Sequence, residues 1–189
     1  NAKYDQIICD GKQIGYDVVS YLIRLGHRKI SYIGETVNEN RYEGYCEALR
    51  KAQIPLDEKY VANVTHSTEE GYKGVFNLLD KGCDATAYFC ADDITAIGAM
   101  RAIKEPGLKI PDDISVISID DIETSQYLSP MLSTVHIPLE EMGRMAARIL
   151  IDRIEEGHGE HLKILFPYNI MERQSTAPPG ICEMKGEKE

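Results

Sequence analysis

The chain has 189 residues, enough for one large domain or one and a fraction, and 43% of them are hydrophobic, which is sufficient for a real core. It carries 31 Asp and Glu against 21 Lys and Arg, a formal net charge of −10. This balance argues against nucleic-acid binding by this segment, because phosphate contacts need clustered Lys and Arg. We expect a soluble cytosolic protein without membrane contact, since no apolar run approaches the ~18 residues of a membrane span.

The five cysteines are odd in number and none forms a Cys-x-x-Cys pair. We therefore expect neither a disulfide framework nor a zinc site.

Strand-like and helix-like segments alternate along the first two thirds of the chain. In chain order we predict strand 6–9, helix 15–25, strand 29–34, helix 40–52, strand 60–64, a helix opened by the capping box at 67–70, strand 85–90, helix 93–104 and strand 115–119. This alternation predicts the α/β class, with βαβ units and a parallel sheet flanked by helices around a flavodoxin-like core.

The alternation breaks after residue 121. Residues 122–130 are predicted to form a loop in which Tyr127 and Leu128 serve as anchors. There follow a strand at 132–136, a long helix at 139–155 with one apolar face, and extended segments at 162–166 and 168–171. The tail from Pro178, rich in Pro, Gly, Lys and Glu, is expected to be disordered.

Strand 115–119 is apolar on both faces and ends on two carboxylates, which places it in the middle of a parallel sheet. Polar residues follow the other strands too, so the candidates at the strand ends are Asp10, Glu35, Arg41, Thr65, His66, Asp92, Asp120 and Asp121. The carboxyl ends of parallel strands gather at one edge, where open α/β folds bind their ligands. The sequence therefore predicts a site for a polyhydroxylated or otherwise polar small molecule.

Each candidate also has a structural interpretation. Asp92 can N-cap the helix that follows it. Asp120 and Asp121 can be turn formers, and as neighbours facing one crevice they would repel unless a donor-rich ligand or a cation lay between them. Arg41 can be a solvated residue at a helix start, and His66 a residue of a surface loop.

Catalytic and metal-binding motifs are not found in the sequence. It contains no Gly-x-Ser-x-Gly elbow, no Walker loop and no Gly-x-Gly-x-x-Gly, and its histidines lack a metal-ligand spacing. We interpret His27 as solvated at the start of a strand, and His158 and His161 as exposed. The pattern predicts a site that binds without reacting, with no cofactor and no metal.

Seven segments together resemble a known family. They are 26–30 (Gly-His-Arg-Lys-Ile), 41–44 (Arg-Tyr-Glu-Gly), 91–100 (Ala-Asp-Asp-Ile-Thr-Ala-Ile-Gly-Ala-Met), 111–116 (Pro-Asp-Asp-Ile-Ser-Val), 120–121 (Asp-Asp), 130–135 (Pro-Met-Leu-Ser-Thr-Val) and 173–176 (Arg-Gln-Ser-Thr). In order and spacing they resemble the bacterial lactose-repressor/galactose-repressor family of transcription regulators, and the resemblance runs from about residue 6 to residue 176.

The resemblance implies a periplasmic-binding-protein-like fold of two similar lobes, with an effector, commonly a sugar or nucleobase, in the cleft. It implies a homodimer that the effector shifts between DNA-bound and released states. By position, Arg41 matches the family's ligand-clamping arginine and Asp120 the acid that takes ligand hydroxyls. Asp92 stands where the family often has Asn, and His66 where some members place an aromatic or polar contact.

Several departures from the family pattern bear on the effector. Asp instead of Asn at position 92 removes an amide donor and adds charge. Ser118 and Ile119 replace the usual Gly and aromatic residue, and Ile137 and Leu139 are apolar where some sugar binders have polar contacts. We expect a carbohydrate effector that differs from the best-known sugars.

The resemblance also implies a division of the chain. Residues 1–177 resemble a partial effector-binding domain, in which 11–136 is mainly the C-terminal lobe and 138–167 supplies a helix and strand of the N-terminal lobe, followed by the tail 178–189. The rest of that lobe and a helix-turn-helix headpiece for DNA are expected outside this chain. Because the apolar face of helix 139–155 would then lack its partner, we expect self-association, by exchange of this C-terminal segment between chains.

Two other functions are compatible with the residues. An extracytoplasmic sugar-binding protein of a transporter would share the fold, although free cysteines suit that compartment poorly. An enzyme could use the Asp92-Asp93 and Asp120-Asp121 pairs around a metal, but no nucleophile or phosphate loop supports it.

Overall fold

A computed structural model describes residues 4–155 and 157–180 of the chain. Its main body is a six-stranded sheet, in the order β3-β2-β4-β5-β6-β8, together with the helices that cover it. The strands are β2 (Ile30–Gly34), β3 (Val61–Asn63), β4 (Ala87–Cys90), β5 (Ser115–Asp120), β6 (Ser133–His136) and β8 (Asn169–Met171). The helices are α1 (Gly11–Leu25), α2 (Asn40–Lys51), α3 (Thr68–Asp80), α4 (Asp93–Lys104) and α5 (Leu139–Ile154).

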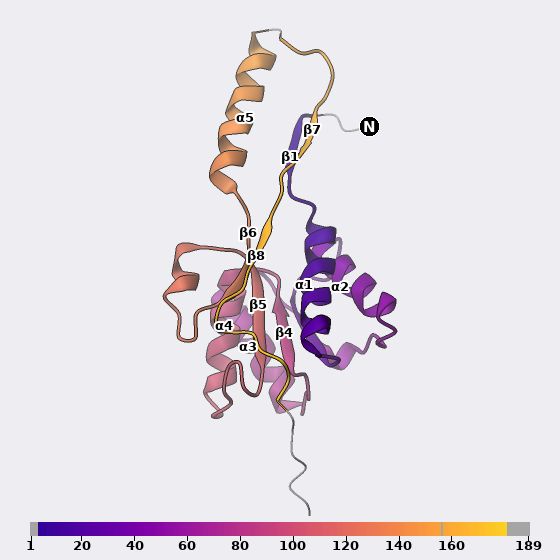
Figure 1. Ribbon diagram of the computed structural model, residues 1–189, viewed down its shortest axis with the longest axis vertical. Helices are drawn as coiled ribbons and strands as arrows, with labels where there is room; N and C mark the ends of the chain where they lie inside the picture. The colour runs from indigo at the N-terminus through magenta and orange to yellow at the C-terminus, as the bar shows by residue number, and fades with distance from the viewer. Residues whose placement is uncertain (1–3, 156, 181–189) are drawn as a thin grey trace, which may run out of the picture.

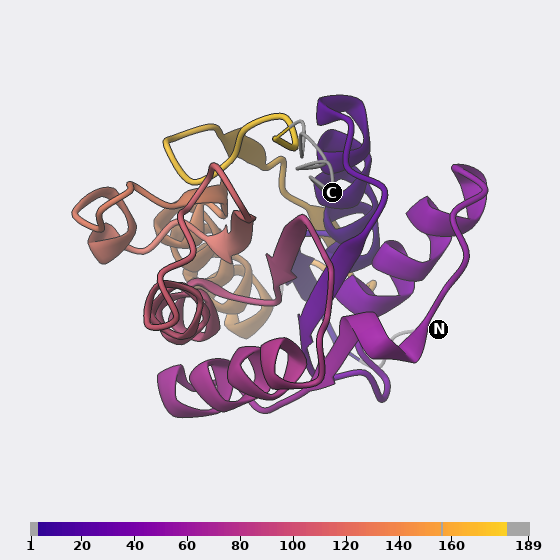
Figure 2. The same ribbon diagram turned by 90° about the horizontal axis from the view of Figure 1, so that it is seen from below.

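The sheet is covered by helices on both faces, as the sequence predicts. One core lies between the sheet and α1 and α2, with Val18, Leu22 and Tyr45 fully buried. The other lies between the sheet and α3 and α4, and it includes Val75 and Ile103. Figure 2 shows the two helix pairs on opposite sides of the strands. The α/β class with a parallel sheet flanked by helices is confirmed.

One strand departs from the parallel arrangement. β8 is antiparallel to β6, whereas the other neighbouring strands of this sheet are parallel. β6 leads out of the main body and β8 returns to it (Figure 1), so the two adjacent strands must run in opposite directions.

Local signals explain where the helices begin and end. α1 begins at Gly11, earlier than predicted, because the Asp10 carboxylate accepts the backbone N–H groups of Lys12 and Gln13. It ends at Leu25 and is capped by Gly26, whose φ of 109° is easily adopted only by glycine. α3 has the predicted Ser67 cap. Two short 3-10 helices, η1 (Glu58–Tyr60) and η2 (Glu123–Gln126), replace parts of a predicted strand and a predicted loop.

The close approach of α1 and α2 depends on two glycines. A Cβ on Gly44 would lie 2.1 Å from the Lys12 carbonyl oxygen, and one on Gly15 would lie 2.3 Å from the Arg41 carbonyl oxygen. Side chains cannot be accommodated at such distances, so glycine lets the two helix backbones touch. This contact fixes the start of α2, and with it Arg41, above the sheet edge.

An arm projects from the main body and consists of β1 (Gln6–Ile8), α5 and β7 (Lys163–Leu165). β1 and β7 form a two-stranded parallel sheet. The Asp5 carboxylate joins the arm's elements, since it accepts from the Arg153 guanidinium at 2.7 and 2.9 Å and from the Leu162 N–H at 2.8 Å. These bonds, above all those from Arg153, hold the pKa of Asp5 below its usual range.

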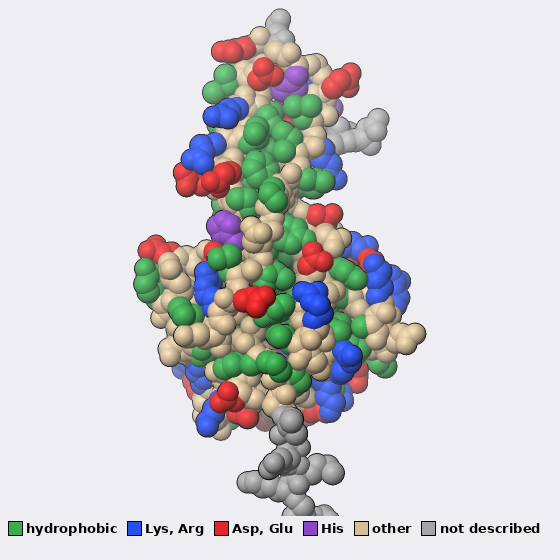
Figure 3. Space-filling view, viewed as in Figure 1, with side chains coloured by type: hydrophobic (Ala, Val, Ile, Leu, Met, Phe, Trp, Pro, Cys, Tyr) green, Lys and Arg blue, Asp and Glu red, His purple; other side chains and the backbone are tan. Residues whose placement is uncertain are grey.

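The arm carries much of the exposed apolar surface. Leu150 and Ile154 of α5 are 61% and 71% exposed, and Figure 3 shows apolar side chains gathered along the arm. Tyr4, Ile7 and Ile149 line a hollow of about 550 Å³ between α5 and β1. In the described residues, therefore, the predicted apolar face of this helix is only partly covered.

The expectations for His27 and Tyr127 are wrong. His27 is buried, because its Nδ1 lies 2.8 Å from Thr86 Oγ1 and its Nε2 2.9 Å from the Ala177 carbonyl oxygen. Tyr127 is 74% exposed and anchors nothing, whereas Leu128 does pack on a core.

His158 also differs from the expectation, since it is partly buried between Asp152 and Asp5. The tail predicted to be disordered from Pro178 begins with a half-buried Pro179 beside Gly26; residues 181–189 lie outside the described residues.

Candidate ligand-binding site

Four of the predicted residues, Arg41, His66, Asp92 and Asp120, come together at the carboxyl edge of the six-stranded sheet, whereas Asp10 caps α1 after β1, a strand of the arm. Asp92 follows β4, Asp120 ends β5, and His66 lies in the loop between β3 and α3. The Arg41 guanidinium reaches this edge and donates to the Ala91 carbonyl oxygen at 2.6 Å. The charges of Arg41 and His66 lower the pKa of Asp120 and that of Asp92 raises it, and we refer to these four side chains as the cluster.

Asp92 has two roles in this cluster. Its Oδ1 accepts the Thr95 N–H at 2.7 Å and so caps α4, which was the structural interpretation of this residue. Its Oδ2 accepts from Thr95 Oγ1 at 3.1 Å and also contacts Nδ1 of His66. The His66 side chain is 39% exposed. The two interpretations of Asp92 are therefore compatible, because one oxygen caps the helix while the other holds the histidine.

Arg41 is held at two of its nitrogens. Besides its bond to Ala91, its Nε lies 3.1 Å from the Glu39 carboxylate. Glu39 also accepts the Arg41 backbone N–H at 3.0 Å and caps α2. The guanidinium is consequently oriented by the protein before any ligand arrives, which reduces the entropy lost on binding.

Asp120 is the least satisfied acid of the cluster. Burial raises its pKa to about 6, an effect opposed by the positive charge of Arg41 and reinforced by Asp93 and Asp92. Its φ is 116°, in the left-handed region, and Asp121 follows with a φ of 57°. Such conformations cost about 1–3 kcal/mol each and persist where the surroundings enforce them.

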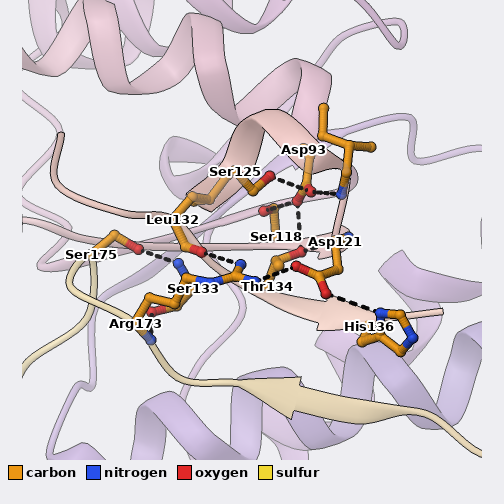
Figure 4. A network of polar contacts seen from close by, with 11 residues as sticks. Asp93, Ser118, Asp121, Ser125, Leu132, Ser133, Thr134, His136, Arg173 and Ser175 are labelled. Carbon is orange, nitrogen blue, oxygen red and sulfur yellow. Dashed lines mark hydrogen bonds and ion pairs between the residues drawn. The ribbon is translucent and has the colours of Figure 1, made fainter. Parts of the chain in front are cut away.

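Asp121 has its partners outside this cluster. Its carboxylate accepts from the Arg173 guanidinium at 2.6 Å and lies 2.9 Å from Nδ1 of His136. Arg173 in turn donates to the Leu132 carbonyl oxygen at 2.9 Å (Figure 4). The expected repulsion between the two adjacent acids is therefore relieved at Asp121, which is paired with Arg173, while the Asp120 side chain has no hydrogen-bonded partner among the described residues.

Sequence reasoning missed the role of Asp93. This carboxylate is fully buried and accepts four hydrogen bonds: from Ser118 Oγ, from Thr134 Oγ1 at 2.6 Å, from Ser125 Oγ at 2.6 Å and from the Ile122 N–H at 2.8 Å. Figure 4 shows these donors converging from β5, η2, β6 and the turn after β5. The concentration of Ser and Thr around the strand ends was a signal for such a buried acceptor.

The network around Asp93 positions Asp120. The bond to the Ile122 N–H fixes the chain two residues after Asp120, and the bonds to Ser118 and Thr134 hold β5 itself and the neighbouring strand β6. It also removes Asp93 from metal coordination, because all its near partners are donors. Within residues 4–155 and 157–180 we find no cluster of three or more His, Cys, Asp or Glu side chains suited to a metal ion.

Two further observations concern the surface of the described residues. A hollow of about 720 Å³ lies over α2 beside Tyr42 and Cys46, away from the cluster. In the part of the chain that the structure describes, each helix is too short or too polar to span a bilayer.

The chain is similar to known proteins over most of its length. Residues 19–176 match the family described as a periplasmic binding protein-like domain. The chain belongs to this family. It is 38% identical, over 91% of its length, to the HTH-type transcriptional repressor PurR of Photorhabdus laumondii, of which it covers 52%. The chain thus spans about half the length of the curated relatives it matches.

Solved structures give the same result. A LacI family transcriptional regulator from Enterococcus faecium with bound ribose aligns with a TM-score of 0.85 at 33% identity, covering 92% of this chain and 66% of that one. A sugar-binding LacI-family regulator from Escherichia coli complexed with phosphate aligns with a TM-score of 0.84 at 34% identity, covering 92% and 63%. The resemblance to the lactose-repressor/galactose-repressor family is confirmed, and these relatives are regulators rather than transport proteins or enzymes.

Proposed function

We propose that this chain is the effector-sensing part of a LacI-type transcriptional regulator and that its effector is a carbohydrate. One observation carries the proposal: Arg41, His66, Asp92 and Asp120 meet at the ligand-binding edge of a sheet whose fold is shared with sugar-binding regulators. The cluster offers oriented donors and acceptors but no activated nucleophile, so it binds the effector without transforming it.

The arm supports the proposed division into lobes. Residues 11–136 form most of the main body, and the partly covered apolar face of α5 in the segment 138–167 suits a helix that packs on further residues of a second lobe. The effector would lie between the lobes, and its differential affinity for the closed state would shift the equilibrium. DNA would be bound through an N-terminal headpiece of the whole protein, which would act as a homodimer in the cytoplasm.

The proposal is tested with the whole protein. A thermal-shift panel of neutral sugars, nucleobases and sugar phosphates identifies the effector, and a titration of operator-DNA binding measures the response. Asp120→Ala and Arg41→Ala should each weaken the effector response at least about tenfold, because each removes an oriented polar contact. Asp112→Ala, an exposed acid of the same lobe, is the matched control.

Two results would contradict the assignment. An unchanged effector titration in both cluster variants would remove these residues from the site. A whole protein that no compound of the panel stabilises, and whose DNA binding none alters, would refute the sensing function itself.

A further inference from the structure

The contact between His66 and Asp92 determines which ring nitrogen carries the proton. The Asp92 Oδ2 lies against Nδ1 of His66, and a carboxylate oxygen can only accept a hydrogen bond. Nδ1 must therefore be the protonated nitrogen of a neutral His66 ring. Within the described residues Nε2 has no hydrogen-bond partner, and in this tautomer it is an acceptor.

The rest of the cluster offers mainly acceptors as well. The Asp120 carboxylate is an acceptor with no hydrogen-bonded partner for its side chain among the described residues. The main donor, Arg41, already gives two of its nitrogens to Ala91 and Glu39. A ligand that meets this edge must consequently supply hydrogens, as hydroxyl and amine groups do, whereas a carboxylate or phosphate would face acceptors and negative charge.

We propose that Asp92 is a positioning residue that holds His66 with Nε2 as a hydrogen-bond acceptor, and that this pair makes the site select hydroxyl- or amine-bearing effectors over anionic ones. This inference rests on the proposed effector-sensing function. It connects two features of this chain, the acid at position 92 and the imidazole at position 66, because the first fixes the hydrogen-bonding sense of the second.

Asp92→Asn separates this positioning role from the capping role. Asn is an equally good N-cap, so its oxygen can keep the bond to the Thr95 N–H. Its amide NH₂ then faces His66 and donates to Nδ1, which moves the ring proton to Nε2. The substitution should leave folding nearly unchanged and reverse the polarity that His66 presents to a ligand.

The first experiment observes the tautomer directly. The whole protein is labelled with ¹⁵N-histidine and its imidazole correlations are recorded at about pH 8 to 9, where an ordinary histidine is neutral. His66→Asn assigns the His66 signals by their loss. Two histidines serve as internal references: His136, whose Nδ1 faces Asp121, and His27, whose Nε2 must donate to the Ala177 carbonyl oxygen.

We expect His66 to show the Nδ1–H pattern, as His136 does, and Asp92→Asn to convert it to the Nε2–H pattern of His27. An Nε2–H ring or a persistent imidazolium in the unsubstituted protein would overturn the proposal, since Nε2 would then donate. An Nδ1–H ring that Asp92→Asn leaves unaltered would show that Asp92 does not set it, and would overturn it equally.

The second experiment tests selectivity with the effector panel. The strongest ligand should be neutral or amine-bearing, and Asp92→Asn should weaken it about tenfold while its carboxylate analogue loses less or gains. A ligand bearing phosphate or carboxylate as the strongest binder would defeat the selectivity inference but leave the sensing function standing. The absence of any ligand would instead refute the proposed function.

Discussion

Asp93 should contribute more to stability than other acids of the main body. Asp93→Ala leaves four donors without their acceptor, of which three are hydroxyl groups that can rotate and one, the Ile122 N–H, cannot. A buried donor left unsatisfied costs about 1–3 kcal/mol, and breaking a buried charged network costs about 3–5 kcal/mol. We expect the free energy of unfolding to fall by about 4 kcal/mol, a large share of the about 5–15 kcal/mol of a typical domain.

Asp93→Asn provides the graded comparison. Its oxygen can keep the Ile122 N–H while its NH₂ faces Ser118 and Thr134, whose hydroxyls rotate to accept, so the loss should be only about 2 kcal/mol. Urea unfolding followed by circular dichroism measures both, with Asp112→Ala as the exposed control, expected to stay within about 0.5 kcal/mol. A loss below about 1 kcal/mol in Asp93→Ala, at an unchanged denaturant slope, would refute the view that this network stabilises the strand ends.

Three further predictions concern pH and helix contact. Asp120→Asn should raise the free energy of unfolding above pH 6 and have no such effect below about pH 4. The reason is that the pKa of Asp120 in the folded protein, about 6, exceeds the ordinary 3.8, so the folded protein loses stability as this acid ionises. Melting temperatures measured across that pH range test this prediction. Burial lowers the pKa of His27, so as the pH falls His27 is protonated in the unfolded chain before it is protonated in the folded protein. The free energy of unfolding should therefore decrease as the pH drops below about 6.5. His27→Asn should make that decrease smaller in the same measurement. Gly44→Ala should lower the free energy of unfolding in urea by about 2–3 kcal/mol, because its Cβ would meet the Lys12 carbonyl oxygen. Gly143→Ala, whose Cβ would have nothing within 4 Å, should instead stabilise α5 by up to about 1 kcal/mol. Equal effects of the two substitutions would contradict the packing argument.

The order and type of the elements could be predicted because local signals agree with the tertiary arrangement. Strand 115–119 is apolar on both faces, and it does lie inside the sheet between β4 and β6. The Ser67 cap and Gly26 fixed helix ends to the residue. The prediction for His27 was wrong because contacts with residues distant in the sequence determine its burial. Its ring nitrogens contact Thr86 and the Ala177 carbonyl oxygen, and the basic residues next to it in the sequence give no indication of these partners.

The proximity of four candidate residues was predictable, but the arrangement was not, and two other candidates lie outside the cluster: Asp10 follows β1 in the arm, and Asp121 pairs with Arg173. The carboxyl edge of the sheet collects Arg41, His66, Asp92 and Asp120 by topology alone, so their proximity followed from the strand assignments. The arrangement of the two adjacent acids did not: both have positive φ angles, and Asp121 is paired with Arg173 while Asp120 has no side-chain partner among the described residues. Aspartate tolerates that conformation but does not require it, and the sequence therefore carries no signal for it.

The division of labour among the acids explains how a strongly acidic edge can remain folded. Asp93 is surrounded by donors, Asp121 is paired with Arg173 and His136, and Asp92 caps a helix while holding His66. Only Asp120 keeps a desolvated charge without a side-chain donor among the described residues, and burial raises its pKa for that reason. If the proposed site is correct, a ligand hydroxyl at Asp120 would supply the missing donor, and effector binding would relieve the unfavourable desolvation of this carboxylate.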